Sequence, residues 1–528
     1  MTDTHDYIIV GAGAAGCVLA SRLSQDPSVQ VLLIEAGPPD SNSALHVPAA
    51  LGSLRRTRWD WDYHSDPEPA LDGRLMVLPY GKTLGGSSSI NGMIYIRGNP
   101  ADYEEWKSLG CEGWGWDDVL PYFMKAEDNE RGQSELHARG GPLTVSDGRS
   151  QHPLGEAWLE AANQAGLPSN PDFNGPAQDG VGRYQLTQRD GMRCSAATAY
   201  LHPAMTRPNL RVLTGALVTR ILLEGDRAAG VEVEHDNQLK RFSADLEVIL
   251  SAGAYNSPQL LLLSGIGHAA DLKALGIQVV ADLPVGRNLQ DHPSVFISVL
   301  VRGESLWSEL RKPESVALFK SGRGPLTSNY GEVGGFWRSN DGLEAPDVQY
   351  HAVPLVYTEQ GSSKSTDNAS SWGACLLKRL SRGSVSLRSA EPSAKPRIVH
   401  NYYGEGAEFE TMVRGVQMAI EIGNQPTMRR LAHGQVAPHP RSDSRADVGE
   451  FVRRATQTTH HPVGTCAMGS VVGSDLRVHG FGNLRVVDAS IMPTIVRGNT
   501  LAPTIMIAEK AADQILDRAQ SHQSLRET

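Results

Sequence analysis

The sequence predicts an α/β fold that begins with a strand, a glycine turn, a helix and a second strand. Residues 7–10, YIIV, form a short apolar run that leads directly into the glycine-rich segment GAGAAG at 11–16. The segment CVLASRLSQ then carries apolar residues at helical spacing, and VQVLLIEAG has the pattern of a buried strand. This order is typical of a nucleotide-binding β-α-β unit.

Further strands of the same unit are predicted far along the chain. Apolar strand patterns lie at 210–225, 228–235, 245–254 and 483–490, and the segment APTIMIAEKAADQILDRA after the last of them is helical. We therefore expect a Rossmann-like domain assembled from discontinuous segments.

A second domain is expected because the composition and the strand pattern of the sequence change between residues 293 and 454. Gly, Ser and Pro interrupt short strand-like stretches there, which indicates an α+β domain with a large sheet and long connections. We assign this domain to the substrate. The predicted segments are 1–150, 193–292 and 455–528 for the nucleotide domain, and 151–192 and 293–454 for the substrate domain.

Composition restricts the partners. The 528 residues contain 49 Lys and Arg against 59 Asp and Glu, a net charge of -10, which argues against a nucleic-acid partner. The start lacks the pattern of a secretory signal, and no apolar run reaches the ~18 residues of a membrane span, so a cytoplasmic protein is expected. The cysteines show no CxxC spacing, which indicates neither a disulfide framework nor a metal site; they are Cys17, Cys111, Cys194, Cys375 and Cys466.

The glycine turn has the spacing of a dinucleotide-binding fingerprint. Gly11, Gly13 and Gly16 fit GxGxxG, in which absent side chains let a pyrophosphate approach the start of the helix. Glu35, at the end of the second strand, is placed to accept hydrogen bonds from a ribose hydroxyl. A glycine-rich packing turn is the alternative, and the motif alone does not separate NAD from FAD.

Longer sequence patterns distinguish an FAD-binding protein from an NAD-binding one. The segments GKTLGGSSSINGMIYIRG (81–98) and GAYNSPQLLLLSGIG (253–267) resemble the two signatures of the glucose-methanol-choline (GMC) oxidoreductase family. The resemblance extends over essentially the whole chain through VGRNLQDH (285–292), HHPVGTCAMG (460–469) and VVDASIMP (486–493). Within this family, the resemblance is nearest to alcohol, choline, sorbose and polyethylene glycol dehydrogenases. It implies a two-domain fold, FAD as cofactor, and oxidation of an alcohol by hydride transfer to flavin N5.

The resemblance also assigns cofactor contacts. Gly85, Gly86 and Ser87 to Ser89 form a loop rich in hydrogen-bond donors, and Asn91 follows it. Some relatives attach the flavin covalently to a histidine where this chain has Ile90, so we expect dissociable FAD. Asp488 is expected near the ribityl and pyrophosphate part of FAD, with a helix cap as the alternative.

The last helix is expected to point its positive end at the flavin. Pro503 suits the first position of this helix. The dipole of such a helix stabilises negative charge at its N-terminus, here the pyrimidine end of reduced flavin.

The catalytic base is expected at His461, the histidine before proline in HHPVG. Neighbouring side chains of an extended segment face opposite ways, so only one of the two histidines is expected to face the flavin. The resemblance implies that it is His461, because the family pattern HPVGT places the base before proline, and His460 is left as a supporting residue. An imidazole has an ordinary pKa of ~6.5 and can accept the proton of the substrate hydroxyl near neutral pH.

The segment NTLAPT departs from the family pattern. The resemblance implies a second polar residue, Asn or His, at the place of Leu501, whereas Asn499 and Thr500 match. His461 is therefore expected to lack its usual partner, with Leu501 presenting an apolar wall. Four substitutes remain open besides Asn499 itself: His460, Asn329, Tyr330 and His351.

The predicted function is FAD-dependent oxidation of an alcohol, with a primary alcohol favoured, to an aldehyde. A dehydrogenase is favoured over an oxidase, and a quinone, a redox protein or oxygen is left open as acceptor, as is a peripheral contact with the inner membrane. The alternative is a non-redox member of the family such as a hydroxynitrile lyase. A nicotinamide dehydrogenase does not explain the paired signatures, and a serine hydrolase lacks the G-x-S-x-G elbow.

Overall fold

The computed structural model describes residues 3–358 and 365–526 of the chain. One half of the molecule is built on a seven-stranded mixed sheet with the order β11-β2-β1-β14-β13-β12, in which β23 pairs with β14. The strands are β1 (Asp3–Val10), β2 (Val31–Ile34), β11 (Leu210–Leu213), β12 (Ala216–Glu224), β13 (Arg227–His235), β14 (Gln238–Leu250) and β23 (Leu484–Val486). The predicted Rossmann-like sheet of separated segments is thereby confirmed.

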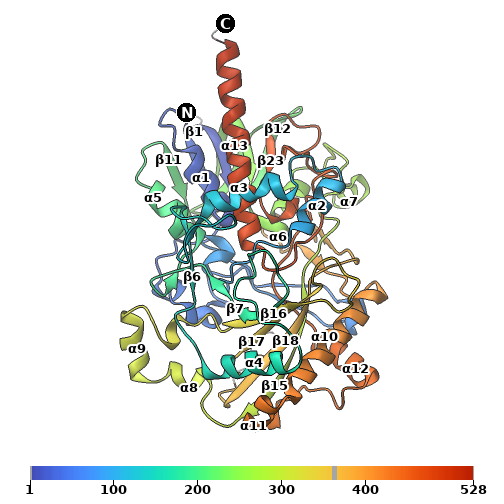
Figure 1. Ribbon diagram of the computed structural model, residues 1–528. Helices are drawn as coiled ribbons and strands as arrows, with labels where there is room; N and C mark the ends of the chain where they lie inside the picture. The colour runs from blue at the N-terminus through green and yellow to red at the C-terminus, as the bar shows by residue number, and fades with distance from the viewer. Residues whose placement is uncertain (1–2, 359–364, 527–528) are drawn as a thin grey trace.

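Burial explains why the parallel strands of this sheet are continuously apolar. β2, VLLI, is buried at all four positions, because parallel strands are covered on both faces. One cover consists of α1 (Ala14–Leu23), α13 (Leu501–Arg526) and α3 (Trp116–Ala126), with α13 packed against the other two. In Figure 1 the C-terminal turns of α13 project beyond the body of the protein.

The last helix begins at Leu501, so Pro503 is its third residue and not its first. The expected position of Pro503 is therefore wrong by two residues. Proline is tolerated there because the first turn of a helix has no carbonyl partners for its N–H groups.

A second seven-stranded sheet, antiparallel throughout, forms the other half, with the order β21-β15-β18-β17-β16-β7 and β22 beside β15. Its strands are β7 (Gly180–Arg183), β15 (Pro293–Val301), β16 (Val333–Trp337), β17 (Val348–Val353), β18 (Ala369–Leu376), β21 (Ala432–Gln435) and β22 (Gln457–Thr458). The expected large sheet is present, and β7 and β15 to β21 come from the ranges assigned to the substrate domain. The domain boundaries themselves stay a prediction.

Strand alternation gives the second sheet two different faces. Tyr350 of β17 belongs to the apolar core that also contains Trp372 and Val416, and its hydroxyl donates to Gly415 O of the covering helix α10 (Gly406–Asn424) at 2.9 Å. His351, the next residue, points to the opposite face and lines a cavity. Further cover comes from α4 (Pro153–Gln164), α11 (Pro426–Leu431) and α12 (Arg445–Ala455) (Figure 1).

Shorter elements connect and edge these layers. The helices are α2 (Pro100–Ser108), α5 (His202–Ala204), α6 (Gly253–Leu263), α7 (Ala269–Ala274), α8 (Leu306–Leu310) and α9 (Pro313–Lys320). The strands are β3 (Tyr63–His64), β4 (Val77–Leu78), β5 (Glu127–Asn129), β6 (Leu143–Asp147), β8 (Gln185–Leu186), β9 (Gln188–Arg189), β10 (Met192–Arg193), β19 (Ser384–Ser386) and β20 (Arg397–Val399). Among the short 3-10 turns, η4 (Gly86–Ser89) and η8 (Ala489–Ile491) reach the cavity.

Candidate active site

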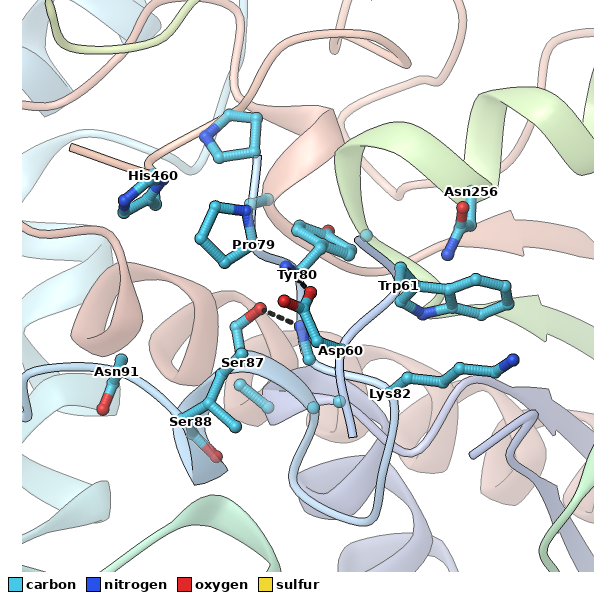
Figure 2. A pocket seen from close by; sticks show the side chains of 18 of the residues that line it. Asp60, Trp61, Pro79, Tyr80, Lys82, Ser87, Ser88, Asn91, Asn256 and His460 are labelled. Atoms are coloured by element: carbon cyan, nitrogen blue, oxygen red, sulfur yellow. Dashed lines mark hydrogen bonds between the residues drawn. The ribbon is translucent and has the colours of Figure 1, made fainter. Parts of the chain in front are cut away.

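A cavity of about 600 Å³ lies between the two sheets and is lined by residues of both. One end is formed by the glycine turn after β1 and by Glu35, and the other by His351 and Val353 of β17. Figure 2 shows His460 on one side of it, Trp61, Lys82 and Asn256 on the other, and Ser87 between them. Its volume is in the range of ~300–1,000 Å³ that small-molecule and cofactor sites occupy.

The glycine turn is shaped for a ligand. A Cβ on Gly11 or Gly16 would lie 2.6 Å from Ser251 O or 1.9 Å from Gly11 O, so packing alone requires these two glycines. Gly13 differs, because a Cβ there would meet only Ser251 O at 3.7 Å. Gly13 lines the cavity at the start of α1, so the space beside it suits the close approach of a phosphate.

Glu35 is held rigidly at the end of β2. Its carboxylate accepts hydrogen bonds from the N–H groups of Ala12, at 2.9 Å, and Gly37, at 2.8 Å. Burial raises the pKa of Glu35 to about 7. The side chain lines the cavity and can accept further hydrogen bonds from a ribose, as the sequence predicts.

The predicted flavin loop touches the glycine turn. Gly86, with φ of 53°, packs so closely that a Cβ would lie 2.7 Å from Gly13 Cα. Ser87 is exposed toward the cavity, and its hydroxyl accepts from the Gly81 N–H at 3.1 Å (Figure 2). The hydroxyls of Ser88 and Ser89 instead donate to Gly85 O and Leu84 O, so these two serines hold the loop and do not offer hydroxyl donors to a cofactor.

Asp488 caps a short 3-10 turn and lines the cavity, and its place beside FAD stays a prediction. Its carboxylate caps η8 by accepting from Ser490 N, and it also accepts from Gly253 N at 2.8 Å and Ser257 Oγ at 2.6 Å, at the start of α6. Burial raises the pKa of Asp488 above its ordinary value. The residue lines the cavity and ties β23 to α6, and Thr500 lines the cavity as well.

His461 lies between two polar partners. Its Nδ1 is 3.0 Å from Nδ1 of His292, and its Nε2 is 3.2 Å from Nδ2 of Asn499. The backbone N–H of His461 donates to Oδ1 of Asp291 at 2.7 Å. These contacts fix both the ring and the segment that carries it.

The carbonyl of Leu377 decides the tautomer of His461. Nε2 of His292 lies 3.0 Å from Leu377 O, which can only accept, so this nitrogen carries the proton. A neutral His292 then accepts at Nδ1, and His461 must donate its Nδ1–H to it. Burial lowers the pKa of His461 to about 4 and that of His292 well below 6.5, so both rings are neutral at pH 7. Nε2 of His461 is therefore unprotonated and turned toward Asn499.

His461 does have a polar neighbour, because Asn499 lies 3.2 Å from its Nε2, whereas Leu501 offers no polar group. The chain turns into α13 at Leu501, which leaves Asn499 in the segment before the helix. Leu501 lines the cavity and packs against the core of the first sheet, as an apolar wall.

The other proposed substitutes do not contact Nε2 of His461. Asn329 donates to the carbonyls of Gly92 and Gly331, and the Tyr330 hydroxyl donates to Ala49 O. His351 and His460 line the cavity, and burial lowers the pKa of each to about 3, with a smaller contribution from Arg55 for His460. The two histidines are neutral polar walls of the site.

Comparison with known proteins agrees with this geometry. Family models described as GMC oxidoreductase match residues 5–294 and 380–508. The chain belongs to the GMC oxidoreductase family. It is 44% identical to the mitochondrial choline dehydrogenase of Homo sapiens over 97% of this chain and 90% of that one. It is 43% identical to an alcohol dehydrogenase [acceptor] of Pseudomonas putida over 97% and 96% of the two chains.

Among solved structures, pyridoxine 4-oxidase from Mesorbium loti superposes with a TM-score of 0.89 and 33% identity, covering 97% of this chain and 99% of that one. This GMC oxidoreductase is thus an FAD-dependent enzyme that oxidises CH–OH groups. The non-redox lyase alternative is not favoured, because the relatives are dehydrogenases and oxidases. The residues present fit FAD, because Gly13 leaves space for a phosphate and Glu35 offers a buried acceptor at one end of the cavity.

Sequence reasoning missed two residues of this GMC site. Asp291 and His292 stand within the motif VGRNLQDH, but neither received a role. Their contacts reach His461 across more than 160 residues of chain, and no local pattern gives such a pairing. The signal available in the sequence was an acid followed by a histidine at the end of the family motif VGRNLQDH.

Over residues 3–358 and 365–526, no group of three or more His, Cys, Asp or Glu side chains could hold a metal ion. In the same part of the chain, no helix combines the length and apolar character of a membrane span. The five cysteines are all buried free thiols.

Proposed function

We propose that this protein is a dehydrogenase that oxidises a primary alcohol to an aldehyde with His461 as the base. The observation that carries the proposal is the unprotonated Nε2 of His461, which faces Asn499 in the cavity and is held so by His292 and Leu377 O. FAD, when bound, supplies the hydride acceptor. The dehydrogenases named above, at 44% and 43% identity, are more similar to this chain than the oxidase at 33%, and this supports a dehydrogenase over an oxidase.

Asn499 and His461 have different roles at the hydroxyl group of the substrate. Asn499 donates an N–H to the substrate oxygen, and Nε2 of His461 accepts the hydroxyl proton; such a base contributes ~10²–10⁴ in rate. The imidazolium that forms is stabilised by Asp291, whose carboxylate accepts the backbone N–H of His461. Burial would raise the pKa of Asp291, but the nearby His400 and hydrogen bonds from Thr458 and Tyr402 keep it below its usual value.

Dissociable FAD is part of the proposal. Ile90, where some relatives carry the histidine that binds flavin, has no nucleophilic atom and lines the cavity. Acid precipitation of the purified protein should release all yellow colour into the supernatant. A yellow pellet would contradict dissociable FAD without touching the role of His461.

The function is tested by an anaerobic visible spectrum titrated with primary alcohols, diols, sugars and choline. We expect bleaching by a primary alcohol in the wild type, persisting on admission of air if the enzyme is a dehydrogenase. His461→Ala should keep the yellow colour and lose at least ~10² in the bleaching rate. The exposed His268→Ala serves as control and should bleach normally. A fully active His461→Ala enzyme would move the base elsewhere.

A further inference from the structure

Arg193 is a buried cation whose hydrogen bonds all go to neutral groups. The side chain, on β10, is 2% exposed. Its Nε donates to Leu45 O at 2.9 Å, and its Nη1 donates to Ser88 O at 3.1 Å and to Asn91 O and Oδ1 at 2.8 Å each. Its Nη2 is buried without a hydrogen-bond partner. Over the described residues, no carboxylate pairs with it.

Other fully buried guanidinium groups of the protein have a carboxylate. Arg97 pairs with Glu127 at 2.7 Å, and Arg379 pairs with Glu408 at 3.0 Å. An unpaired charge in the interior is costly, and a compensating group is the usual solution. Burial lowers the pKa of Arg193 to about 9, so it is still a cation at neutral pH.

The partners of Arg193 place its charge directly behind the cavity. Ser88 and Asn91 belong to the strip 87–94 that lines the cavity (Figure 2). Oδ1 of Asn91 also accepts the N–H of Met93, a buried residue with a φ of 58°. Arg193 does not itself line the cavity, and it thus holds a strained strip of the lining in place from outside the cavity and ties it to Leu45.

We propose that Arg193 positions the strip 88–91 for FAD and that its unpaired charge stabilises reduced FAD relative to oxidised FAD. Two-electron reduction makes the flavin more electron-rich, so a cation across a thin protein layer favours the reduced form. The proposal rests on FAD in this cavity and not on His461 as the base. A failure of either idea can therefore be recognised separately.

The test compares Arg193→Lys, which keeps the charge, with Arg193→Gln and Arg193→Met, which remove it. Apoprotein is reconstituted with FAD, and the dissociation constant and the midpoint potential are measured. All three variants should bind FAD more weakly, because none reproduces the hydrogen bonds to the carbonyls of Leu45, Ser88 and Asn91. In the Gln and Met variants the affinity for reduced relative to oxidised FAD should fall at least tenfold, which lowers a two-electron potential by ~30 mV. The Lys variant should keep the wild-type potential.

Arg189→Gln is the matched control. Arg189 lies in the same hairpin, but it is exposed and donates to Thr144 Oγ1 and Pro142 O. The same loss of charge there should change neither quantity, because water screens it.

Equal potentials in the Lys, Gln and Met variants would overturn the electrostatic role, and unchanged FAD affinity would overturn the positioning role. Arg193→Gln and Arg193→Met remove the charge with side chains of different polarity, so the misfolding of one neutral variant leaves the other for the test. If both neutral variants fail to fold while Arg193→Lys folds, the charge serves the apoprotein, and the cofactor role is overturned.

Discussion

At the residue scale, the reactivity of His461 is set by atoms that the substrate never touches. A backbone carbonyl accepts the Nε2–H of His292, Nδ1 of His292 accepts from His461, and Nε2 of His461 is left with its lone pair. The acceptor of the substrate proton thus follows from the direction of three hydrogen bonds. A carbonyl does not titrate, so this arrangement holds over the whole working pH range.

The partner of His461 can be tested by exchanging two neighbouring positions. Asn499→Ala should lower kcat/KM by about tenfold or more, because a buried oxygen that loses a hydrogen bond costs ~1–3 kcal/mol. Leu501→Asn should have a smaller effect, since Leu501 only forms a wall. Steady-state kinetics with the same alcohol decides between them. A larger loss from the Leu501 change would restore that position as the polar partner.

The pH dependence of the reaction tests the environment of His461. Burial among His292, His351 and His460 lowers the pKa of His461 to about 4, and Asp291 partly opposes the shift. The base is inactive when protonated, so kcat/KM should stay level on the acid side and fall only as the pH drops through about 4.

Asp291→Asn should move that acid limb to lower pH and also reduce the plateau, because the imidazolium loses its stabilising charge. Glu68→Gln is a control in a neighbouring buried carboxylate, which bonds His400 and not His461. Full pH profiles of both variants are required. An acid limb that stays in place in Asp291→Asn would show that this carboxylate does not act on His461.

At the element scale, two glycine segments from opposite sides of the cavity are in contact. The turn at 11–16 and the start of η4 approach so closely that only glycine fits at both Gly13 and Gly86 without separation of the segments or loss of ligand space. The first comes from the β-α-β unit and the second from the family signature at 81–98. Their contact positions the phosphate end of the cavity relative to the flavin loop.

Gly86→Ala should therefore impair cofactor binding more than folding. The added Cβ would lie 2.7 Å from Gly13 Cα, at a φ of 53° that an L-residue rarely adopts. FAD content after purification and the dissociation constant measure the effect, which we expect to be at least tenfold. Gly52→Ala, whose Cβ meets only the Tyr330 hydroxyl at 3.8 Å, should bind FAD normally. Equal FAD content in the two variants would contradict this role of the contact.

The elements that the sequence predicts well are those with a local cause. Apolar continuity located β1, β2 and the strands of 210–254, and the glycine spacing located the turn that lines one end of the cavity. The start of α13 was misplaced because Pro503 is compatible with every position of a first turn. Pairings across the chain, such as His292 with His461 or Arg193 with Asn91, arise from the packing of distant segments, and no periodicity encodes them.

At the scale of the whole molecule, a cavity walled by neutral imidazoles makes the protein sensitive to acid. Burial lowers the pKa of His351 and His460 to about 3 and that of His461 to about 4, and it lowers that of His292 as well. In the unfolded chain each has a pKa of ~6.5. These groups contribute stability above pH 6.5 that is lost as the pH falls toward 4, because only the unfolded state takes up the protons.

Two further groups, Glu35 and His137, have pKa values that are raised in the folded protein. Burial raises the pKa of Glu35 to about 7, so its native state takes up a proton in the same range and offsets one histidine. His137 is opposed by burial, but hydrogen bonds to Asp172 and Glu127 raise its pKa to about 9. Its contribution is complete below pH 6.5 and is lost as the pH rises through 9, so it adds no slope in acid.

Over the four cavity histidines and Glu35 the net difference is about three protons, so these five groups together should lower the free energy of unfolding by ~4 kcal/mol per pH unit between pH 6 and 4.5. Chemical denaturation of the cofactor-free protein across this range measures the slope. His351→Phe removes one of the four imidazoles from a wall that already packs against Tyr184, so its slope should be shallower by ~1.4 kcal/mol per unit. His268→Ala, which removes an exposed ring, should leave the slope unchanged. Parallel curves for the wild type and His351→Phe would mean that His351 is protonated in the native state, and the cavity would then carry a charge that its neutral walls are built to exclude.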